Sequence, residues 1–386
     1  MLLPLIFLKE LTAFPHRGVG SEYEKEAASL INKTLQNIGF NTSEQQFRTP
    51  KTYVPIVWEF LGVIIVGLLL VDVSGLVGGI FIYLILRTVI EALLYFDWRL
   101  PFFNTFDPWI GVQSQNIIGN VLPSTSNLPK IILMAHYDTA PVSALYKKQT
   151  ANSFRNSIRL SMLLMALCVP LSILICIFPE NQVLFWVKYA FIIYFLLQGI
   201  IGTIDYFRKG FTNGASDNAT GVVAAIATAE RLKDKLKNHD LEIVLTSAEE
   251  AGMIGAYHYW KHRFDKNTTS YLINFDTLGA GELKFITQSG SWTTITYENI
   301  VKHTAQKLSE TDTRFSNVLA GKWHTADFDT AWFARGGVPC LTLAALDENG
   351  LMPRIHRPED TLDHVDTTPM LQAIDFAEAI CLELDK

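Results

Sequence analysis

The sequence has little charge and few cysteines. Only 18% of its 386 residues are charged, and 32 Lys and Arg face 38 Asp and Glu, for a net charge of −6. A nucleic-acid-binding protein needs an excess of basic side chains to neutralise phosphates, so we expect no nucleic-acid partner. The four cysteines do not resemble a disulfide framework, because Cys168 and Cys176 lie in an apolar run and Cys340 and Cys381 stand far apart.

The first residues lack the features of a secretory signal peptide. The segment MLLPLIFLKELTAFPHRG has no basic residue before its apolar part and no clear small-residue cleavage site. We therefore expect it to belong to a first helix or to pack on the folded domain.

Apolar residues are abundant instead. They make up 49% of the chain, and the mean hydropathy of +0.20 favours a membrane protein over typical soluble composition. Two pairs of apolar stretches, each about 20 residues long, approach the length that crosses a bilayer. They predict four transmembrane helices in two hairpins, residues 53–98 and 158–204, with turns at DVSG and PENQ. The alternative is a pair of buried core hairpins, although core helices are rarely apolar all round.

Charges at the ends of the hairpins predict their orientation. Arg87 and Glu91 interrupt the second apolar stretch four residues apart, where they can pair on one helix face. Basic residues gather at the bases of both hairpins: Arg48, Lys51, Arg99, Lys147, Lys148, Arg155, Arg159, Arg208 and Lys209. By the positive-inside rule, we expect a multi-pass integral membrane protein whose remaining residues form a domain on the cytoplasmic side.

Outside the hairpins, strand-like and helix-like segments alternate. Strands are predicted at 117–122, 131–135, 241–246, 271–275, 283–287 and 339–344, and helices at 21–38, 217–236, 250–262, 295–309, 325–335 and 368–385. This alternation predicts an α/β fold with a largely parallel, mixed sheet and helices on both faces, built from residues 1–52, 99–157 and 205–386.

Metal-binding residue types follow several of these strands. His136 and Asp138 follow the strand at 131–135, Glu249 and Glu250 follow 241–246, and Asp276 follows 271–275, while Asp217 and His356 lie in loops. Each has an ordinary alternative: Asp217 as a helix N-cap, the glutamates as a solvated helix start, and a histidine after a strand as structural. Because sites form beyond the carboxyl ends of parallel strands, the whole set favours a catalytic divalent-metal site, most plausibly zinc.

The same residues resemble a known family. The ordered blocks AHYDTA (135–140), GASDNATG (214–221), SAEEAG (247–252), NFDTLG (274–279) and IHRPEDTLDHVD (355–366) are similar to those of the M28 zinc aminopeptidases. The resemblance runs from about residue 8 to the end, apart from the hairpins, and implies the zinc exopeptidase fold and activity on peptides.

The resemblance implies a role for each site residue. His136, Asp276 and Asp217 would hold one Zn²⁺, and Glu250, His356 and the same Asp217 a second, although other divalent metals are possible. Asp138 would contribute to catalysis by orienting His136, since a ligand imidazole usually donates its other N–H to a carboxylate. Glu249 would stay free of metal and act as general base on a water between the ions.

Several positions depart from the family pattern. Many relatives have a tyrosine before the last histidine, where it supports the oxyanion, but this chain has Ile355. Where relatives often have Ser-Asp-His, this chain has Ala326, Asp327 and Phe328. Asp327 would hold a substrate ammonium or be a buried structural carboxylate. We expect His324 to be structural.

Alternatives to a membrane-embedded dinuclear zinc aminopeptidase remain open. One is a glutaminyl-cyclase-like acyltransferase with a single zinc, and another is a non-catalytic membrane receptor or scaffold on the same fold. The expected partners are a peptide substrate and the lipid bilayer, and the oligomeric state is left open. Because the second hairpin separates Asp138 from Asp217, we expect the site mouth to face the membrane, rimmed by residues 146–159 and 206–211.

Overall fold

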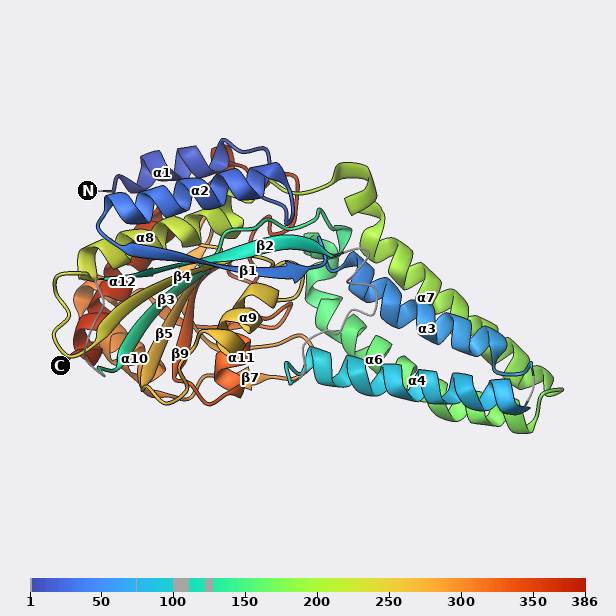
Figure 1. The fold of residues 1–386 in the computed structure, drawn as a ribbon. Helices are drawn as coiled ribbons and strands as arrows, with labels where there is room; N and C mark the ends of the chain where they lie inside the picture. Colours follow the sequence, from blue (N-terminus) through green and yellow to red (C-terminus); the bar gives the residue numbers. More distant parts are fainter. Residues whose placement is uncertain (1, 74, 100–110, 122–127) are drawn as a thin grey trace.

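The computed structural model, which describes residues 2–73, 75–99, 111–121 and 128–386, places four long helices at one end of an α/β domain. Figure 1 shows these helices projecting together from the domain, with both chain termini at the opposite end. The site residues lie between these two parts, as described below.

The elements have the following bounds. The helices are α1 (Pro4–Thr12), α2 (Glu22–Asn37), α3 (Val54–Leu70), α4 (Gly75–Phe96), α6 (Lys148–Ile177), α7 (Gln182–Lys209), α8 (Thr220–Leu232), α9 (Ile254–His262), α10 (Ile300–Thr311), α11 (Thr330–Arg335) and α12 (Thr368–Leu384). The strands are β1 (Asn41–Thr49), β2 (Val112–Asn120), β3 (Lys130–His136), β4 (Asp240–Thr246), β5 (Ser270–Asp276), β6 (Glu282–Ser289), β7 (Ile295–Thr296), β8 (Leu319–Trp323) and β9 (Cys340–Leu346).

One mixed sheet forms the centre of the domain. Its strand order is β1-β2-β4-β3-β5-β9-β6-β7, with β8 paired to β6. The four central strands, from β4 to β9, are parallel, whereas β1, β2, β6 and β7 join by antiparallel pairing. The mixed α/β fold is thus confirmed, with parallel pairing in the centre. Strands β1, β7 and β8 were not predicted from the sequence, and two of them have only five residues or fewer.

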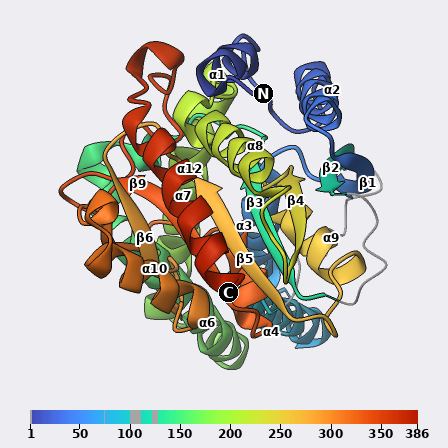
Figure 2. The ribbon, with the colours of Figure 1, turned by 90° about the vertical axis from the view of Figure 1, so that its left-hand side faces the viewer.

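Side chains alternate between two cores on the two faces of the sheet. Ile131 and Leu133 of β3 pack with α1, α2, α8, α10 and α12, while Ile132 and Met134 pack with α9, α11 and the long helices. Figure 2, seen from the end opposite these helices, shows α8 and α12 on one side of the central strands and α9 on the other. The second core continues without a break into the interior of the long helices.

The N-terminal segment packs on the domain as expected. Helix α1 buries Phe7, Leu8 and Leu11 in the first core. Helix α2 begins at the N-cap Ser21, whose side chain accepts a hydrogen bond from the Glu24 amide, and it is followed by Gly39 at φ +97°. Glycine adopts this left-handed conformation without steric cost, which ends the helix where the sequence predicted.

The four long helices form a bundle, defined here as α3, α4, α6 and α7. Within the bundle, α3 packs on α4 and α7, and α4 packs on α6, as Figure 1 shows. In the described part of the chain, three helices are long and apolar enough to cross a membrane: Gly75–Phe96, Ser153–Ile177 and Gln182–Lys209. The predicted fourth span corresponds to α3, which has 17 residues and is shorter than these three.

The outer surface of the bundle is apolar. Its exposed side chains include Leu76, Ile80 and Tyr83 of α4, Leu163 and Ile177 of α6, and Val183, Trp186 and Ile201 of α7. Buried core hairpins would not expose such residues, so that alternative is wrong. The predicted pair forms on α4, with Arg87 Nε 2.7 Å from Glu91 Oε1. At the far end of the bundle, Lys188 of α7 pairs with Asp72 of the α3–α4 turn at 2.7 Å.

Candidate metal centre

Three neighbouring strands bring the predicted residues to one edge of the sheet. His136 is the last residue of β3 and Asp276 the last of β5, and Glu249 and Glu250 lie in the turn that follows β4. Because β3 pairs in parallel with both β4 and β5, their carboxyl ends meet. The glutamates therefore do not start a solvated helix, since α9 begins only at Ile254 and Glu250 is buried.

Two loops complete the cluster. Asp217 lies in the turn before α8, and its Oδ1 is 3.3 Å from His136 Nε2. His356, from the loop after β9, places its Nε2 3.4 Å from Asp217 Oδ2 and 3.0 Å from Glu250 Oε2. Asp276 Oδ2 lies 3.8 Å from His136 Nε2. Asp217 therefore stands between two histidines, with one oxygen facing each.

The geometry of these atoms fits two metal ions. Donor atoms of His136, Asp217 and Asp276 form one compact group, and those of Asp217, Glu250 and His356 form another. Zinc with ligands at about 2.0–2.1 Å in a tetrahedral arrangement separates its donor atoms by about 3.3 Å. The observed separations of 3.0–3.8 Å match this value. Asp217 Oδ2 and Glu250 Oε1 are buried without a hydrogen-bond partner, as expected of atoms arranged for a cation.

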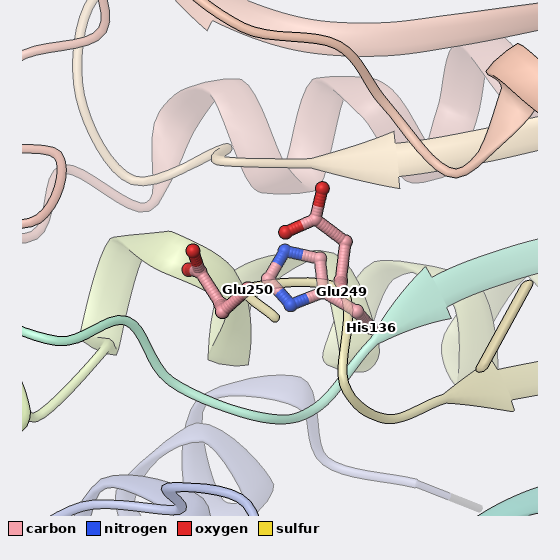
Figure 3. A group of neighbouring side chains, drawn as sticks. All are labelled: His136, Glu249 and Glu250. Atoms are coloured by element: carbon pink, nitrogen blue, oxygen red, sulfur yellow. The ribbon is translucent and has the colours of Figure 1, made fainter. Parts of the chain in front are cut away.

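Glu249 lies beside these groups but in a different environment. Its carboxylate forms a third compact group with His136 and Glu250, and Figure 3 shows it directed toward the imidazole of His136. Unlike Glu250, Glu249 is partly exposed. The two groups that share Asp217 use all five predicted ligands and leave this carboxylate free.

Asp138 connects the histidine to the glutamates. Its Oδ1 lies 3.5 Å from His136 Nδ1, and its two oxygens accept hydrogen bonds from the backbone amides of Glu249 and Glu250, each at 3.2 Å. It is fully buried. Asp138 therefore holds the turn that carries both glutamates, a role that the sequence did not predict, and lies beside the imidazole that it is expected to orient.

Asp360 is a positioning residue that the sequence pattern did not reveal. Its carboxylate accepts hydrogen bonds from the backbone amides of Ser216 at 2.7 Å and Asp217 at 3.1 Å. The fully buried Arg17 supports the same turn from the other side, because its guanidinium donates to the carbonyls of Asn213 and Gly214. No spacing rule marks a carboxylate or a guanidinium that binds only backbone, so neither residue could be singled out within its segment.

The backbone is strained at one site residue and at two residues adjacent to site residues. Ala248, Thr277 and His356 have φ angles of 57°, 48° and 54° in the left-handed region. Ala248 directly precedes Glu249, and Thr277 directly follows Asp276. Side-chain-bearing residues occupy this region only when the surrounding structure holds them there, and such strain clusters at functional sites.

The protonation of the metal-free cluster reflects its excess of carboxylates. Burial raises the pKa of Glu249 well above its usual value, raises that of Glu250 to about 8 and raises that of Asp276 to about 6. Burial opposes the shift of Asp217, but pairing with His136 and His356 lowers its pKa. Burial would also lower the pKa of His136, but the surrounding carboxylates, led by Glu249, raise it well above normal. Cations at this position would relieve the repulsion among the carboxylates.

The cluster opens into a cavity of about 250 Å³ between the domain and the bundle. His136, Asp217 and Glu249 line it on the domain side. All four bundle helices line the other side. The lining residues are Ile56, Val57 and Phe60 of α3 with Tyr53 just before it, Tyr95 and Phe96 of α4, Phe154 and Ile158 of α6, and Gln198, Gly202 and Thr203 of α7. A molecule bound in this cavity would therefore contact the bundle as well as the candidate metal ligands.

The remaining predicted residues divide between the cavity and its surroundings. Asp327 lines the cavity, accepts a hydrogen bond from Ser289 Oγ at 3.3 Å, and has a pKa that burial raises to about 6. From the two predicted rim segments, Tyr146, Phe154 and Ile158 line the cavity, whereas no described lining residue comes from 206–211. His324 is not among the described residues that line it. Trp98 also lines the cavity.

A family comparison agrees with this geometry. The model of peptidase family M28 matches residues 202–380, which contain Asp217, Glu250, Asp276 and His356. Aminopeptidase YwaD of Bacillus subtilis is 27% identical over 194 residues, which are 48% of this chain and 40% of that protein. These comparisons support a similarity to peptidase family M28 over residues 202–380. His136 lies outside the matched region, so its place in the M28 site rests on the geometry described above.

Solved structures share the fold of this chain. A zinc aminopeptidase from Bacillus subtilis aligns with a TM-score of 0.59 at 15% identity, covering 99% of this chain and 94% of that one. A glutaminyl cyclase from Porphyromonas gingivalis aligns with a TM-score of 0.56 at 14% identity, covering 99% and 97%. The fold therefore hosts both chemistries among its relatives. The match to YwaD spans less than half of that protein's length, so the activity has to be argued from the site.

Proposed function

We propose that this chain is a membrane-embedded zinc aminopeptidase that binds two metal ions and hydrolyses N-terminal peptide bonds. The observation that carries the proposal is the pair of ligand groups sharing Asp217, with Glu249 left over and facing the same cavity. His136, Asp217 and Asp276 would hold one ion, and Asp217, Glu250 and His356 the other. Bound zinc would lower the pKa of an attacking water and polarise the substrate carbonyl.

Glu249 has the position of a general base. Its carboxylate accepts a proton from the attacking water while the water oxygen bonds to the carbonyl carbon. It then returns the proton to the leaving amine as the C–N bond breaks. Asp138 holds the Glu249 amide and orients His136, so the base and a metal ligand keep a fixed relation to each other. Asp327 lies in the same cavity and is suited to hold the substrate ammonium, which its negative charge would attract.

A glutaminyl-cyclase-like acyltransferase is the second candidate, because glutaminyl cyclases are among the structural neighbours. Such an enzyme would close an N-terminal glutamine onto its own amine and would need one zinc. Asp217 argues for two ions, since each of its oxygens faces a different histidine. A non-catalytic scaffold is the weaker alternative, because the structure brings together a complete ligand set with a spare carboxylate.

The bundle is proposed to cross the membrane and to place the active site near its surface. Three helices have sufficient length and apolar surface, and α3, at 17 residues, would cross with the help of its flanking residues or by local thinning. Arg208 and Lys209 end α7 at the base of the bundle, which by the positive-inside rule favours a cytoplasmic α/β domain. The apolar wall that the bundle gives the cavity favours peptides with apolar N-terminal residues.

The test uses the full-length protein in detergent with added zinc. Peptides with free and with blocked N-termini are compared, together with N-terminal glutamine peptides, and zinc is counted by elemental analysis. We expect hydrolysis of free-amine peptides and two zinc ions per chain. Glu249→Gln should retain both ions and lose about 10²–10⁴-fold in kcat. A single tightly bound zinc with cyclisation of glutamine would support the cyclase, and full activity of Glu249→Gln would refute the assigned base.

A further inference from the structure

Tyr146 connects the cluster of candidate metal ligands to the bundle. It ends a short 3-10 helix, Ala144–Tyr146, that leads into α6. The Ser143 amide, just before this helix, donates to the carbonyl of His356 at 3.0 Å. On the other side, Thr150 Oγ1 of α6 donates to the carbonyls of Ala144, Leu145 and Lys147. The segment is thus fixed both to a ligand-bearing loop and to a bundle helix.

The ring of Tyr146 packs between these two parts. Its centroid lies 4.1 Å from that of the His356 ring and 5.4 Å from that of Phe154 in α6. It lines the cavity together with Glu249 and Glu250. Its hydroxyl makes no hydrogen bond to the part of the chain that the structure describes, whereas the neighbouring Tyr53 donates to the Gly202 carbonyl at 2.9 Å. The Tyr146 hydroxyl is therefore a free donor beside the metal cluster.

A donor at this position would accelerate peptide hydrolysis. As water adds to the carbonyl carbon, the π electrons move to the carbonyl oxygen, and preorganised donors at that position lower the barrier. Ile355 and Phe328 also line the cavity, but their side chains have no hydrogen to donate. A tyrosine hydroxyl with an ordinary pKa of about 10 remains a neutral donor at physiological pH.

We propose that the Tyr146 hydroxyl donates a hydrogen bond to the oxyanion of the tetrahedral intermediate. The proposal rests on the peptidase function proposed above. In the addition step the water proton goes to Glu249 and the Tyr146 proton stays on its oxygen. When the intermediate collapses, the oxygen lone pair restores the carbonyl, the C–N bond breaks and Glu249 protonates the amine. Tyr146 thus acts only through a hydrogen bond, which is strongest when the oxygen carries full negative charge.

This assignment gives the second hairpin a chemical role. Residues 147–216 separate Tyr146 from Asp217, and they contain α6 and α7. Because Tyr146 stands at the first turn of the path into α6, the bundle would fix the donor as well as wall the cavity. Detaching the bundle from the domain would then impair the chemical step itself.

The experiment compares Tyr146→Phe with Tyr194→Phe in the full-length protein. Phenylalanine keeps the ring against His356 and removes only the hydroxyl. Tyr194 of α7, whose hydroxyl lies 2.9 Å from Ser161 Oγ, is a matched bundle tyrosine that is not among the described residues lining the cavity. The measurements are kcat and KM, zinc content, affinity for free leucine as product, and affinity for a phosphinic dipeptide that mimics the tetrahedral intermediate.

We expect Tyr146→Phe to lose about 10²–10³-fold in kcat, the effect of removing one oxyanion donor. The zinc content, the KM and the affinity for leucine should stay at wild-type values. The affinity for the phosphinic dipeptide should fall by the same factor as kcat. Tyr194→Phe should resemble the wild type in all of these measurements. Unchanged kcat in Tyr146→Phe, or a loss of zinc that explains the lost activity, would overturn the proposal. If the wild type hydrolyses no peptide, the proposed function fails first; if only the variant comparison fails, the peptidase function stands without this role.

Discussion

The α/β domain and the bundle share one of the domain's two apolar cores, yet their outer surfaces differ. On the domain, exposed helices carry ion pairs such as Glu22–Lys25 of α2. On the bundle, exposed positions carry large apolar residues such as Leu163 and Trp186. The same burial rule therefore operates inside both regions, but the bundle surface is apolar, as the proposed membrane location requires, whereas the domain surface carries charge.

Polar groups are also placed differently in the two regions. In the domain they converge at the carboxyl ends of parallel strands, where His136, Asp276 and the turn with Glu250 meet. In the bundle, Lys188 and Asp72 pair at the far end, away from the site. The cavity lies where the two regions join, so one side supplies ligands and charge and the other supplies apolar surface. Changing each side separately should therefore give separable effects.

Removing the proposed shared ligand should have the largest effect. Asp217 belongs to both ligand groups, so Asp217→Asn should eliminate peptide hydrolysis and lower the zinc content of both positions. Asp360→Asn should have a smaller effect, because the Asp360 carboxylate holds the backbone of Asp217 and is not a proposed ligand. The zinc affinity of this variant should fall by about 10–100-fold. Zinc titration and elemental analysis measure both. If Asp217→Asn bound zinc as tightly as the wild type, Asp217 would not be a ligand.

A charge on the bundle surface should have the next largest effect. Leu163 in the middle of α6 and Leu319 of β8 are 56% and 53% exposed, so they form a matched pair. If the bundle crosses a membrane, Leu163→Arg should cost about 2.5–3.5 kcal/mol of insertion free energy. Leu319→Arg should change stability by about 0.5 kcal/mol or less. Membrane-integration and unfolding assays measure these values, and equal small effects at both positions would contradict a lipid-facing α6.

The stability of the metal-free domain should depend on pH. Burial raises the pKa of Glu250 to about 8 and that of Asp276 to about 6, above their values in the unfolded chain. A raised carboxyl pKa contributes stability at low pH, which is lost as pH rises through the folded pKa. We therefore expect the melting temperature of chelator-treated protein to fall from about pH 4, near the ordinary carboxyl pKa, to about pH 8, the raised pKa of Glu250.

Two controls sharpen this pH prediction. Zinc-loaded protein should show little of the fall, because the bound ions compensate the carboxylate charges. Glu250→Gln without metal should lose the upper part of the transition, since the amide does not titrate. A metal-free melting temperature that rises over this pH window would show that the buried carboxylates do not control stability.

Side-chain pattern and order predicted most of the fold and the main cluster. Central strands such as β3 are continuous apolar runs, and their carboxyl ends are defined by the polar residues that follow, so His136 and Asp276 could be placed from residue order alone. Short edge elements such as β7 carry no such run. The extent of α6 was also hidden, because its first turns, from Lys148, are polar and precede the apolar stretch.

Support for the site was harder to predict than its ligands. Asp360 and Arg17 bind backbone atoms, and such bonds depend on loop conformations that no residue pattern specifies. The sequence predicted Tyr146 only as the first residue of the rim segment 146–159, with no role of its own. Its contact with His356 depends on the loop after β9 reaching back across the sheet edge, which is a tertiary relation.

The smallest expected effect compares two exposed ion pairs. Glu22–Lys25 of α2 is 79% and 59% exposed, and Glu91–Arg87 of α4 is 44% and 52% exposed. A helix-surface pair in water contributes about 0.2–0.5 kcal/mol, so Glu22→Gln should cost no more than that.

Glu91→Gln leaves Arg87 without its partner at an apolar surface. Glu91 lies only five residues from the end of α4 at the domain, so the Arg87 side chain can extend toward the proposed membrane surface. This limits the free-energy cost of Glu91→Gln to about 1 kcal/mol. Double-mutant cycles in detergent measure both pairs, and a smaller coupling for Arg87–Glu91 than for Glu22–Lys25 would place this part of α4 in water.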